Sequence, residues 1–228
     1  GSRGIGKACV YEFSNNGYRV FLNYNKSSDE AEKIKNETGV VTVKADVSDS
    51  KQVNDMAEFI HTNYGKIDVI VNNAGISQQK LFTDITENDW DRMFDVNMKS
   101  MYLVTKAFVD DMIYKQSGKI INISSMWGVT GGSCEVHYSA AKAAVIGFTK
   151  ALAKELAPSN IQVNAIACGV IDTQMNACFS EEERAELADE IPAGRFGTPE
   201  ETAHLAVQLA TGNEYLTGQI ITLDGGWL

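Results

Sequence analysis

Short apolar segments alternate with longer amphipathic segments along the whole chain, and this alternation constrains the fold more than any other feature of the sequence. The apolar segments have the length of β-strands, and the segments between them have the length and periodicity of α-helices. Strands that alternate with helices predict an α/β fold, a doubly wound parallel sheet with helices on both faces. The expected strands cover residues 19–23, 40–44, 67–72, 119–123, 161–166 and 219–223.

The expected helices are followed by residues that end helices. Gly17, Gly39 and Gly65 follow the first three, and Pro158 stops a later one. The helices are expected at residues 7–15, 28–38, 49–64, 87–115, 138–156, 180–191 and 198–210. A chain of 228 residues is long enough for one large domain with a full core, so we expect a single domain over 1–228.

The composition argues against several classes of function. A net charge of −10 disfavours nucleic acid or an anionic membrane as a partner. No apolar run approaches the ~20 residues of a membrane span, and no signal peptide pattern opens the sequence. The cysteines show no CxxC or metal-binding spacing and the histidines are scattered, so we expect no metal site and a cytoplasmic protein with reduced thiols at Cys9, Cys134, Cys168 and Cys178.

The sequence opens on a glycine-rich turn, Gly1-Ser-Arg-Gly-Ile-Gly6, that runs directly into a helical pattern. A turn of this kind normally follows a strand and binds phosphate through backbone N–H groups at a helix N-terminus. We therefore expect that a strand of roughly five or six residues, together with the start of the turn, is missing from the sequence given.

Several small or polar residues fall at or just beyond the ends of the expected strands. In open parallel sheets the ligand binds beyond the carboxyl ends of the strands. Residues from distant parts of the chain would therefore meet at one edge, which predicts a nucleotide site with chemistry beside it. They are the glycine turn, Asp46, Asn73 to Gly75, Ser125 and Cys168-Gly169.

Tyr138 and Lys142 are four residues apart, a spacing that places both side chains on one face of a helix. A free tyrosine has a pKa of about 10, and a cation one turn away favours the phenolate and lowers that pKa. A hydroxyl from Ser125 could hold a carbonyl oxygen for the tyrosine to protonate. By themselves the tyrosine and lysine could also be a solvated pair on an ordinary helix.

Taken together, these features resemble the short-chain dehydrogenase/reductase family over the whole chain. The opening turn is similar to the end of the family's TGxxxGxG motif, and Asn72-Asn-Ala-Gly75 matches NNAG. Asn97 stands where the family has a helix asparagine, and the catalytic Ser…YxxxK set is matched by Ser125, Tyr138 and Lys142. Within the family, residues 192–200 and 223–227 are most similar to 3-oxoacyl-[acyl-carrier-protein] reductases and acetoacetyl-CoA reductases.

The resemblance implies a role for each catalytic residue. Tyr138 is the acid that protonates the carbonyl, and Ser125 orients that carbonyl. Lys142 lowers the pKa of the tyrosine and binds the nicotinamide ribose, and Asn97 interrupts a helix and holds a water in a proton relay to Lys142. An asparagine within an apolar helix otherwise costs stability, which fits a functional purpose, although a solvated helix face is the alternative for Asn97.

The resemblance also implies the cofactor contacts and an NADP-type cofactor. The turn would cradle pyrophosphate, the strand ends near 24 and 46 would meet the adenosine half, and the loop after 170 would close over the carboxamide. The expected contacts are Gly1, Ser2, Arg3, Ile5, Tyr24, Asn25, Asp46, Val47, Asn73, Ala74, Gly75, Tyr138, Lys142, Ile171 and Thr173. NAD-specific members have an acidic residue where Tyr24 stands, whereas Arg3 and Lys26 are cations that suit the 2′-phosphate of NADPH.

Our prediction is therefore an NADPH-dependent, Rossmann-like reductase of 3-oxoacyl thioesters carried by an acyl carrier protein or CoA. Surplus apolar residues on the helices at 98–115 and 143–156 predict a homotetramer. Met126 and Trp127 are expected to line the substrate side, with ordinary packing as the alternative. The two alternative functions are a short-chain dehydrogenase of a sugar, polyol or small secondary alcohol, and a nucleotide-binding protein without turnover.

Three positions depart from the pattern of the resembled enzymes. Cys168-Gly169 replaces the family's usual Pro-Gly, so we expect the loop that carries Ile171 to be looser. Arginines that carrier-protein reductases often present near the site correspond here to Gln116 and Ser159.

Overall fold

The computed structural model describes residues 1–177 and 179–228, so Cys178 lies outside the described residues. Helices and strands alternate as expected, and every strand pairing is parallel, which confirms the α/β prediction. The elements are α1 (Gly4–Asn15), β1 (Phe21–Tyr24), α2 (Ser28–Thr38), β2 (Val41–Lys44), α3 (Ser50–Tyr64), β3 (Val69–Asn72), α4 (Glu87–Phe94), α5 (Ser100–Lys115), β4 (Gly118–Ser125), α6 (Trp127–Thr130), α7 (Val136–Leu156), β5 (Ile161–Cys168), α8 (Glu181–Glu190), α9 (Pro199–Thr211) and β6 (Ile220–Leu223).

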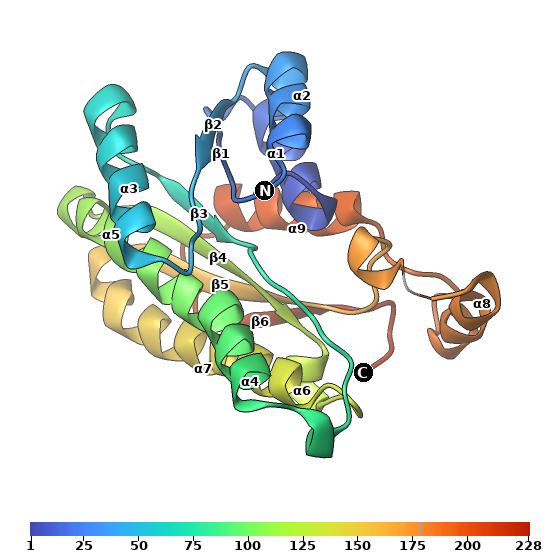
Figure 1. The fold of residues 1–228 in the computed structure, drawn as a ribbon. Helices are drawn as coiled ribbons and strands as arrows, with labels where there is room; N and C mark the ends of the chain where they lie inside the picture. The colour runs from blue at the N-terminus through green and yellow to red at the C-terminus, as the bar shows by residue number, and fades with distance from the viewer. Residues whose placement is uncertain (178) are drawn as a thin grey trace.

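Helices cover both faces of the strands (Figure 1). Neighbouring residues of β4 show this directly, because Ile120 packs with α3, α5 and α7 whereas Ile121 packs with α1 and α9. Both residues are almost fully buried. A strand buried on both faces reads as a continuous apolar run, which is why the sequence pattern identified the strands.

Three local differences from the sequence predictions have physical reasons. β4 and β5 run to Ser125 and Cys168, beyond the predicted ends, because the two strands stay paired in register to those residues. The helix predicted over 87–115 is interrupted by a π turn, Asp95–Lys99, between α4 and α5. The short helix α6 was not predicted, since its four residues are too few to show a periodic pattern.

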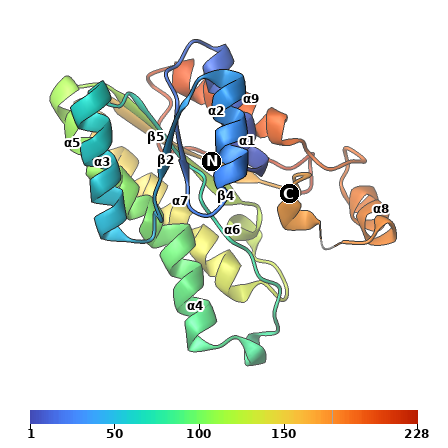
Figure 2. The same ribbon diagram turned by 45° about the horizontal axis from the view of Figure 1, so that its top comes forward.

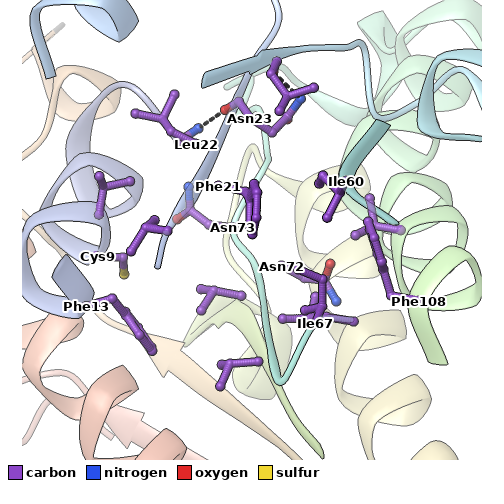
Figure 3. Close-up of a pocket in the computed structure, with 18 of the residues that line it drawn as sticks. Cys9, Phe13, Phe21, Leu22, Asn23, Ile60, Ile67, Asn72, Asn73 and Phe108 are labelled. Atoms are coloured by element: carbon purple, nitrogen blue, oxygen red, sulfur yellow. Dashed lines mark hydrogen bonds between the residues drawn. The ribbon is translucent and has the colours of Figure 1, made fainter. Parts of the chain in front are cut away.

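The strands fall into two groups, β1-β2 and β3-β4-β5-β6, and β1 is not hydrogen-bonded to β3. A cavity of about 480 Å³ lies between the groups and is lined largely by apolar side chains. Figure 3 shows Phe13 and Leu22 on one side of this gap and Ile60 and Phe108 on the other. The strand expected ahead of the glycine turn remains a prediction, and the gap is the part of the sheet that it concerns.

Helix α8 stands out from the rest of the molecule, on the side where the chain ends (Figures 1 and 2). It is acidic, with three glutamates in its first turn and a capping box formed by Ser180 and Glu183. Its Arg184 donates to Asp172 at 2.8 Å and lies over the ring of Phe196, 4.7 Å from the ring centre. These contacts attach α8 to the loops that follow β5.

Candidate active site

Ser125 is the last residue of β4, and its partner across the ladder is Cys168 at the end of β5. Both strand ends are buried, and the Met126 N–H donates to the Cys168 carbonyl at 2.8 Å. The Ser125 Oγ accepts from the Trp127 N–H at 3.2 Å. The hydroxyl is therefore held at the carboxyl end of the β4–β5 pairing, within β4 rather than beyond its predicted end at residue 123.

The small residues around Lys142 allow α7 to approach its neighbours closely. The Ser124 Oγ donates to the Lys142 carbonyl at 2.9 Å, which ties the helix to β4. At Gly128 of α6, an added Cβ would lie 2.7 Å from that same carbonyl oxygen and 3.0 Å from the Ala143 nitrogen. Real Cβ atoms do not come so close to backbone, so Gly128 permits α6 to pack directly on α7 beside the reactive face.

Tyr138 lines the same cavity as Ser125, and only 8% of the residue is exposed. Burial raises the pKa of Tyr138 well above its ordinary value, and the Ser125 hydroxyl opposes this only partly. The net shift is opposite in direction to the lowering expected from Lys142, because desolvation of the phenolate outweighs the nearby polar groups. A phenol with a raised pKa is protonated at neutral pH, which is the form of a proton donor.

Lys142 is buried beside Tyr138, and its Nζ lies 5.7 Å from the centre of the tyrosine ring. The Nζ donates to the Ile123 carbonyl at 3.0 Å. Burial lowers the pKa of Lys142 to about 8, so the ammonium is still largely protonated at neutral pH.

Asn97 lies in the π turn and is completely buried. Its side chain makes two hydrogen bonds to the backbone of Ile76, accepting from N–H at 3.0 Å and donating to the carbonyl at 2.9 Å. A Cβ on Gly75 would lie 2.7 Å from Asn97 Oδ1 and 3.5 Å from Lys142 Nζ. The π turn lies where the family resemblance implied that Asn97 interrupts a helix, and it brings Asn97 and Lys142 to the same glycine.

The glycine turn packs against two other segments at the strand ends. A Cβ on Gly6 would lie 2.7 Å from Asn73 Nδ2, and Gly4, with a φ of +49°, would place a Cβ 3.2 Å from Thr173 Cγ2. The helix α1 begins at Gly4, and Ser2 just before it is buried. Backbone N–H groups at a helix start, with side chains excluded around them, fit a phosphate.

The predicted adenosine contacts lie at the ends of β1 and β2. Asn25 donates to Asp46 at 2.8 Å, and the Ser48 hydroxyl donates to the same carboxylate at 2.6 Å. The Ser48 hydrogen bond holds the pKa of Asp46 below its usual value. Tyr24 is half-buried at the end of β1, and among the described residues no acidic side chain forms an ion pair with the exposed Arg3.

A second cavity, of about 530 Å³, brings most of the predicted site together. Its lining includes Ile5, Asn73, Gly75, Asn97, Ser125, Tyr138, Lys142, Ile171 and Thr173, and also Met126 and Trp127 on the expected substrate side. The remaining predicted contacts lie outside this lining: Gly1, Val47 and Ala74 line the gap in the sheet, and Ser2, Arg3, Tyr24, Asn25 and Asp46 line neither cavity.

The loop that carries Ile171 is held by backbone contacts despite the cysteine before it. Ile171 bridges to Gly197, and the Gly197 N–H donates to the Val170 carbonyl at 2.9 Å. Burial raises the pKa of Cys168 to about 11, so its thiol stays protonated and packs as an apolar group. The looser loop expected from the Cys168 replacement stays a prediction, and these are the contacts on which it depends.

Several residues of the cavity wall were not predicted from the sequence. Polar members come from the segment after β3 and from the start of α7, and apolar members come from α8, its flanking loops and the end of the chain. The strand-end position of residues 76–80 was a usable signal, whereas nothing local marks Leu187 or Trp227. The missed residues are Ser77, Gln78, Gln79, Ser133, Glu135, Val170, Met175, Asn176, Phe179, Leu187 and Trp227.

The described residues contain no group of three or more histidine, cysteine or acidic side chains placed to hold a metal ion. A search of the same part of the chain finds no helix with both the length and the apolar character needed to span a membrane.

Comparison with known proteins identifies the family. A family model described as enoyl-(acyl carrier protein) reductase matches residues 1–228. The chain belongs to the short-chain dehydrogenase/reductase family, and it is thus an NAD(P)H-dependent oxidoreductase that acts on a ketone or alcohol with a nicotinamide cofactor.

Individual relatives match almost the whole chain. The 3-oxoacyl-[acyl-carrier-protein] reductase FabG of Aquifex aeolicus is 40% identical over 99% of this chain and 93% of its own length. The protein of the same name from Thermotoga maritima is 41% identical over 98% of this chain and 93% of its own length. An uncharacterized oxidoreductase, YmfI of Bacillus subtilis, is 41% identical over 99% of this chain and 95% of its own length.

Proposed function

We propose that the protein reduces a 3-oxoacyl thioester to the 3-hydroxyacyl thioester with NADPH. The observation that carries this proposal is the convergence of Ser125, Tyr138, Lys142 and Asn97 on one cavity that also reaches the glycine turn. The similarity to proteins named 3-oxoacyl-[acyl-carrier-protein] reductase, at about 40% identity over nearly the whole chain, supports the substrate class.

Each side chain of the proposed active site has a separate role in the reduction of the carbonyl group. Tyr138, protonated and in the same cavity as Ser125, donates its proton to the carbonyl oxygen, and Ser125 holds that oxygen in place. The Lys142 ammonium stabilises the phenolate that remains, because the two groups share a buried site. Asn97 fixes the backbone at Ile76, and it lies next to Gly75, which Lys142 also approaches.

The chain's own residues fit a dinucleotide. The glycine turn would hold the pyrophosphate, and Thr173 would close over the nicotinamide carboxamide. Asn73 and the ends of β1 and β2 would hold the adenosine half; when bound, NADPH supplies the hydride. The positions where a Cβ would strike Asn73 or Asn97 are glycines, as a closely approached cradle requires. Arg3 and Tyr24, in place of a carboxylate, support a preference for the 2′-phosphate.

The cavity wall supports an acyl substrate on one side. Trp127 and Trp227 meet edge to face with ring centres 6.0 Å apart, and both line the cavity together with Met175 and Leu187. Apolar and aromatic side chains of this kind suit an acyl chain or the thioester carbon chain.

A second candidate function is favoured by polar residues of the same cavity. Gln78, Gln79, Ser133 and Glu135 line it, and polar groups of this kind suit the hydroxyls of a sugar, polyol or small secondary alcohol. The experiment that separates the two candidates measures NADPH oxidation with acetoacetyl-CoA, an acyl-carrier-protein thioester and a panel of keto-sugars. Turnover of the keto-sugars alone would contradict the proposed function.

We also propose a cytoplasmic homotetramer that accepts CoA or acyl-carrier-protein thioesters. Tyr102, Ile113 and Tyr114 remain exposed on α5, where further apolar residues already pack inward. Exposed apolar side chains on a helix that is buried on another face favour contact with a second subunit. Light scattering at micromolar concentration tests the assembly, and a monomeric mass would contradict it.

A further inference from the structure

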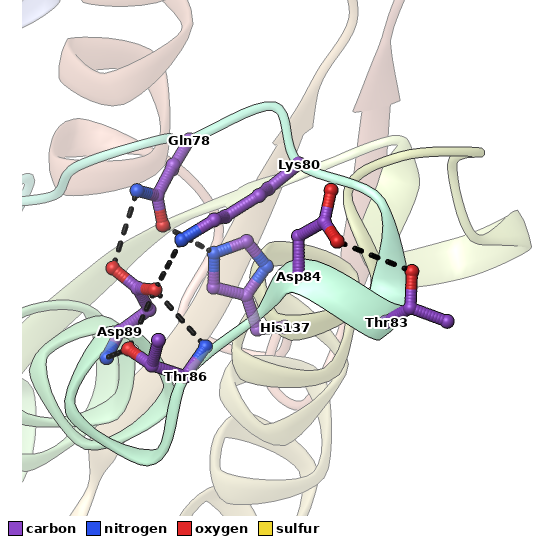
Figure 4. Close-up of polar contacts among 7 residues, drawn as sticks. All are labelled: Gln78, Lys80, Thr83, Asp84, Thr86, Asp89 and His137. Atoms are coloured by element: carbon purple, nitrogen blue, oxygen red, sulfur yellow. Dashed lines mark hydrogen bonds and ion pairs between the residues drawn. The ribbon is translucent and has the colours of Figure 1, made fainter.

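A chain of hydrogen bonds beside the cavity joins three parts of the molecule, and none of the proposed catalytic roles uses it (Figure 4). His137 is the residue immediately before Tyr138 on α7 and is completely buried. Its Nε2 lies 3.0 Å from Gln78 Oε1, and Gln78 Nε2 lies 3.3 Å from Asp89 Oδ1 in α4. Lys80 Nζ donates to the other oxygen of Asp89 at 2.7 Å.

The direction of each hydrogen bond follows from the charge of Asp89. The carboxylate accepts from Lys80 and from the N–H and hydroxyl of Thr86, at 3.0 and 2.7 Å, which keeps its pKa well below the usual range. An ionised carboxylate only accepts, so Gln78 must present its NH₂ to Asp89 and its carbonyl oxygen to His137. His137 must then carry its proton on Nε2.

The other ring nitrogen of His137, Nδ1, is buried and makes no hydrogen bond among the described residues. A buried nitrogen without a partner costs stability. The cost is smaller for a lone pair on Nδ1 of a neutral ring than for an N–H of a charged ring, which fits a proton on Nε2. The Nε2–H bond to Gln78 is the ring's one polar contact.

This bond holds the middle of a cavity wall. Residues 76–80 lie between β3 and α4 in the chain. Ser77, Gln78 and Gln79 of this segment line the cavity. Asn97 fixes one end of this segment at Ile76, and the Lys80 N–H fixes the other end by donating to the Cys134 carbonyl at 2.7 Å. The Gln78 side chain bonds this segment to His137, within the helix that carries Tyr138.

We propose that His137 is a positioning residue that acts through Gln78. The Nε2–H of His137 fixes Gln78, and thereby the wall at residues 76–80, at a set distance from Tyr138 on the same helix. The inference rests on the proposed active site, because the wall matters only if the ketone binds in this cavity. Without the bond, Gln78 turns toward solvent or Asp89 alone, and the wall no longer confines the substrate beside Tyr138.

Two substitutions separate positioning from packing. His137→Gln keeps an N–H donor at a similar reach from the backbone, whereas His137→Leu fills similar space without a donor. We expect His137→Leu to raise KM for acetoacetyl-CoA about tenfold, the effect of losing one buried hydrogen bond, with KM for NADPH within about twofold of the original value. His137→Gln should stay within about threefold on both constants.

Matched controls distinguish a failure of the proposed His137 role from a failure of the proposed active site. His204→Leu, on α9 with a side chain 65% exposed, should leave both constants unchanged. Equal KM values for the leucine and glutamine variants of His137 would overturn the positioning role. A Tyr138→Phe variant that kept full activity would instead overturn the proposed active site.

A spectroscopic measurement tests the same inference if His137→Leu does not fold. Long-range nitrogen–proton correlation in the unsubstituted protein should show His137 neutral, with the proton on Nε2. A proton on Nδ1, or an imidazolium at neutral pH, would contradict the assigned direction of the hydrogen bonds and overturn the proposal.

Discussion

The two groups of strands differ in how firmly they hold the residues at their ends. β4 and β5 are eight residues long and pair along their whole length, and every residue of β5 is buried. β1 and β2 are four residues long, only partly buried, and border a cavity of about 480 Å³. Ser125 and the residues around it are thus fixed by many contacts, whereas Tyr24 and Asn25 at the end of β1 are fixed by few.

The comparison teaches that the reactive centre and the proposed nucleotide side depend on different parts of the fold. Ser125, Tyr138, Lys142 and Asn97 are all more than nine-tenths buried. Asn25 and Arg3 are exposed, and Tyr24 is half-buried. A change at the first group should alter the chemistry, and a change at the second should alter which cofactor binds and how tightly.

The largest effect is expected at the buried centre. Tyr138→Phe removes the proton donor and little volume, so kcat should fall by about 10²- to 10⁴-fold while NADPH binding is nearly unchanged. Steady-state kinetics and fluorescence titration with NADPH measure the two quantities. A variant that keeps more than about a tenth of the original kcat would show that Tyr138 is not the acid. Lys142→Ala should lower both activity and cofactor affinity.

The gap between β1 and β3 gives the next effect. An apolar segment of about six residues fused ahead of Gly1 should pair with both strands and cover the apolar lining. Burying one large apolar side chain is worth about 1.5–3 kcal/mol, so the free energy of unfolding should rise by at least about 2 kcal/mol. Urea denaturation measures this change. A polar segment of the same length is the control, and equal stability of the two fusions would show that the gap does not accept a strand.

A smaller effect is expected on cofactor choice at the end of β1. The protein should prefer NADPH over NADH by at least about tenfold in kcat/KM, equivalent to about 1.4 kcal/mol. Tyr24→Asp combined with Arg3→Ala should reverse this preference, because a carboxylate repels the 2′-phosphate and the guanidinium is lost. Equal or better use of NADH by the unsubstituted protein would refute the role of Arg3 and favour an alcohol dehydrogenase.

The smallest expected effect is the pH dependence of stability that comes from His137 on α7. Burial lowers the pKa of His137 below its ordinary value, with Lys80 acting in the same direction and Asp89 opposing it. The folded protein therefore binds this proton less readily than the unfolded chain, whose histidine titrates near about 6.5. The stabilisation is complete above that pH and declines as pH falls below it. Urea midpoints should fall less on acidification in His137→Gln, and identical slopes would contradict this assignment.

The fold was predictable where one physical signal dominated. Strands buried on both faces gave apolar runs, so β4 and β5 were located to within two residues at each end. Spacing singled out Tyr138 and Lys142, the family resemblance added Ser125, and the structure places the three around one cavity. Strand ends were less certain, because pairing in register, rather than composition, carries β4 through Ser125.

Other parts of the site depend on contacts between distant segments, and local patterns do not report these. The raised pKa of Tyr138 comes from burial by the assembled fold, which the i, i+4 spacing with Lys142 does not reveal. Likewise, Gln78 and His137 are 59 residues apart in the chain, and their hydrogen bond depends on how α7 packs beside the segment after β3. Leu187 and Trp227 reach the cavity wall for the same reason.

The π turn at Asp95–Lys99 places a constraint on chain length in this region. A π turn contains one residue more than the α-helical path between the same two points. Removing one residue here would leave an ordinary α-helical path between α4 and α5, so the turn that holds Asn97 would be lost. Met93 would keep its buried place in α4, whereas Asn97 would lose its hydrogen bonds to Ile76. We therefore expect substitutions in this turn to be tolerated better than single-residue deletions.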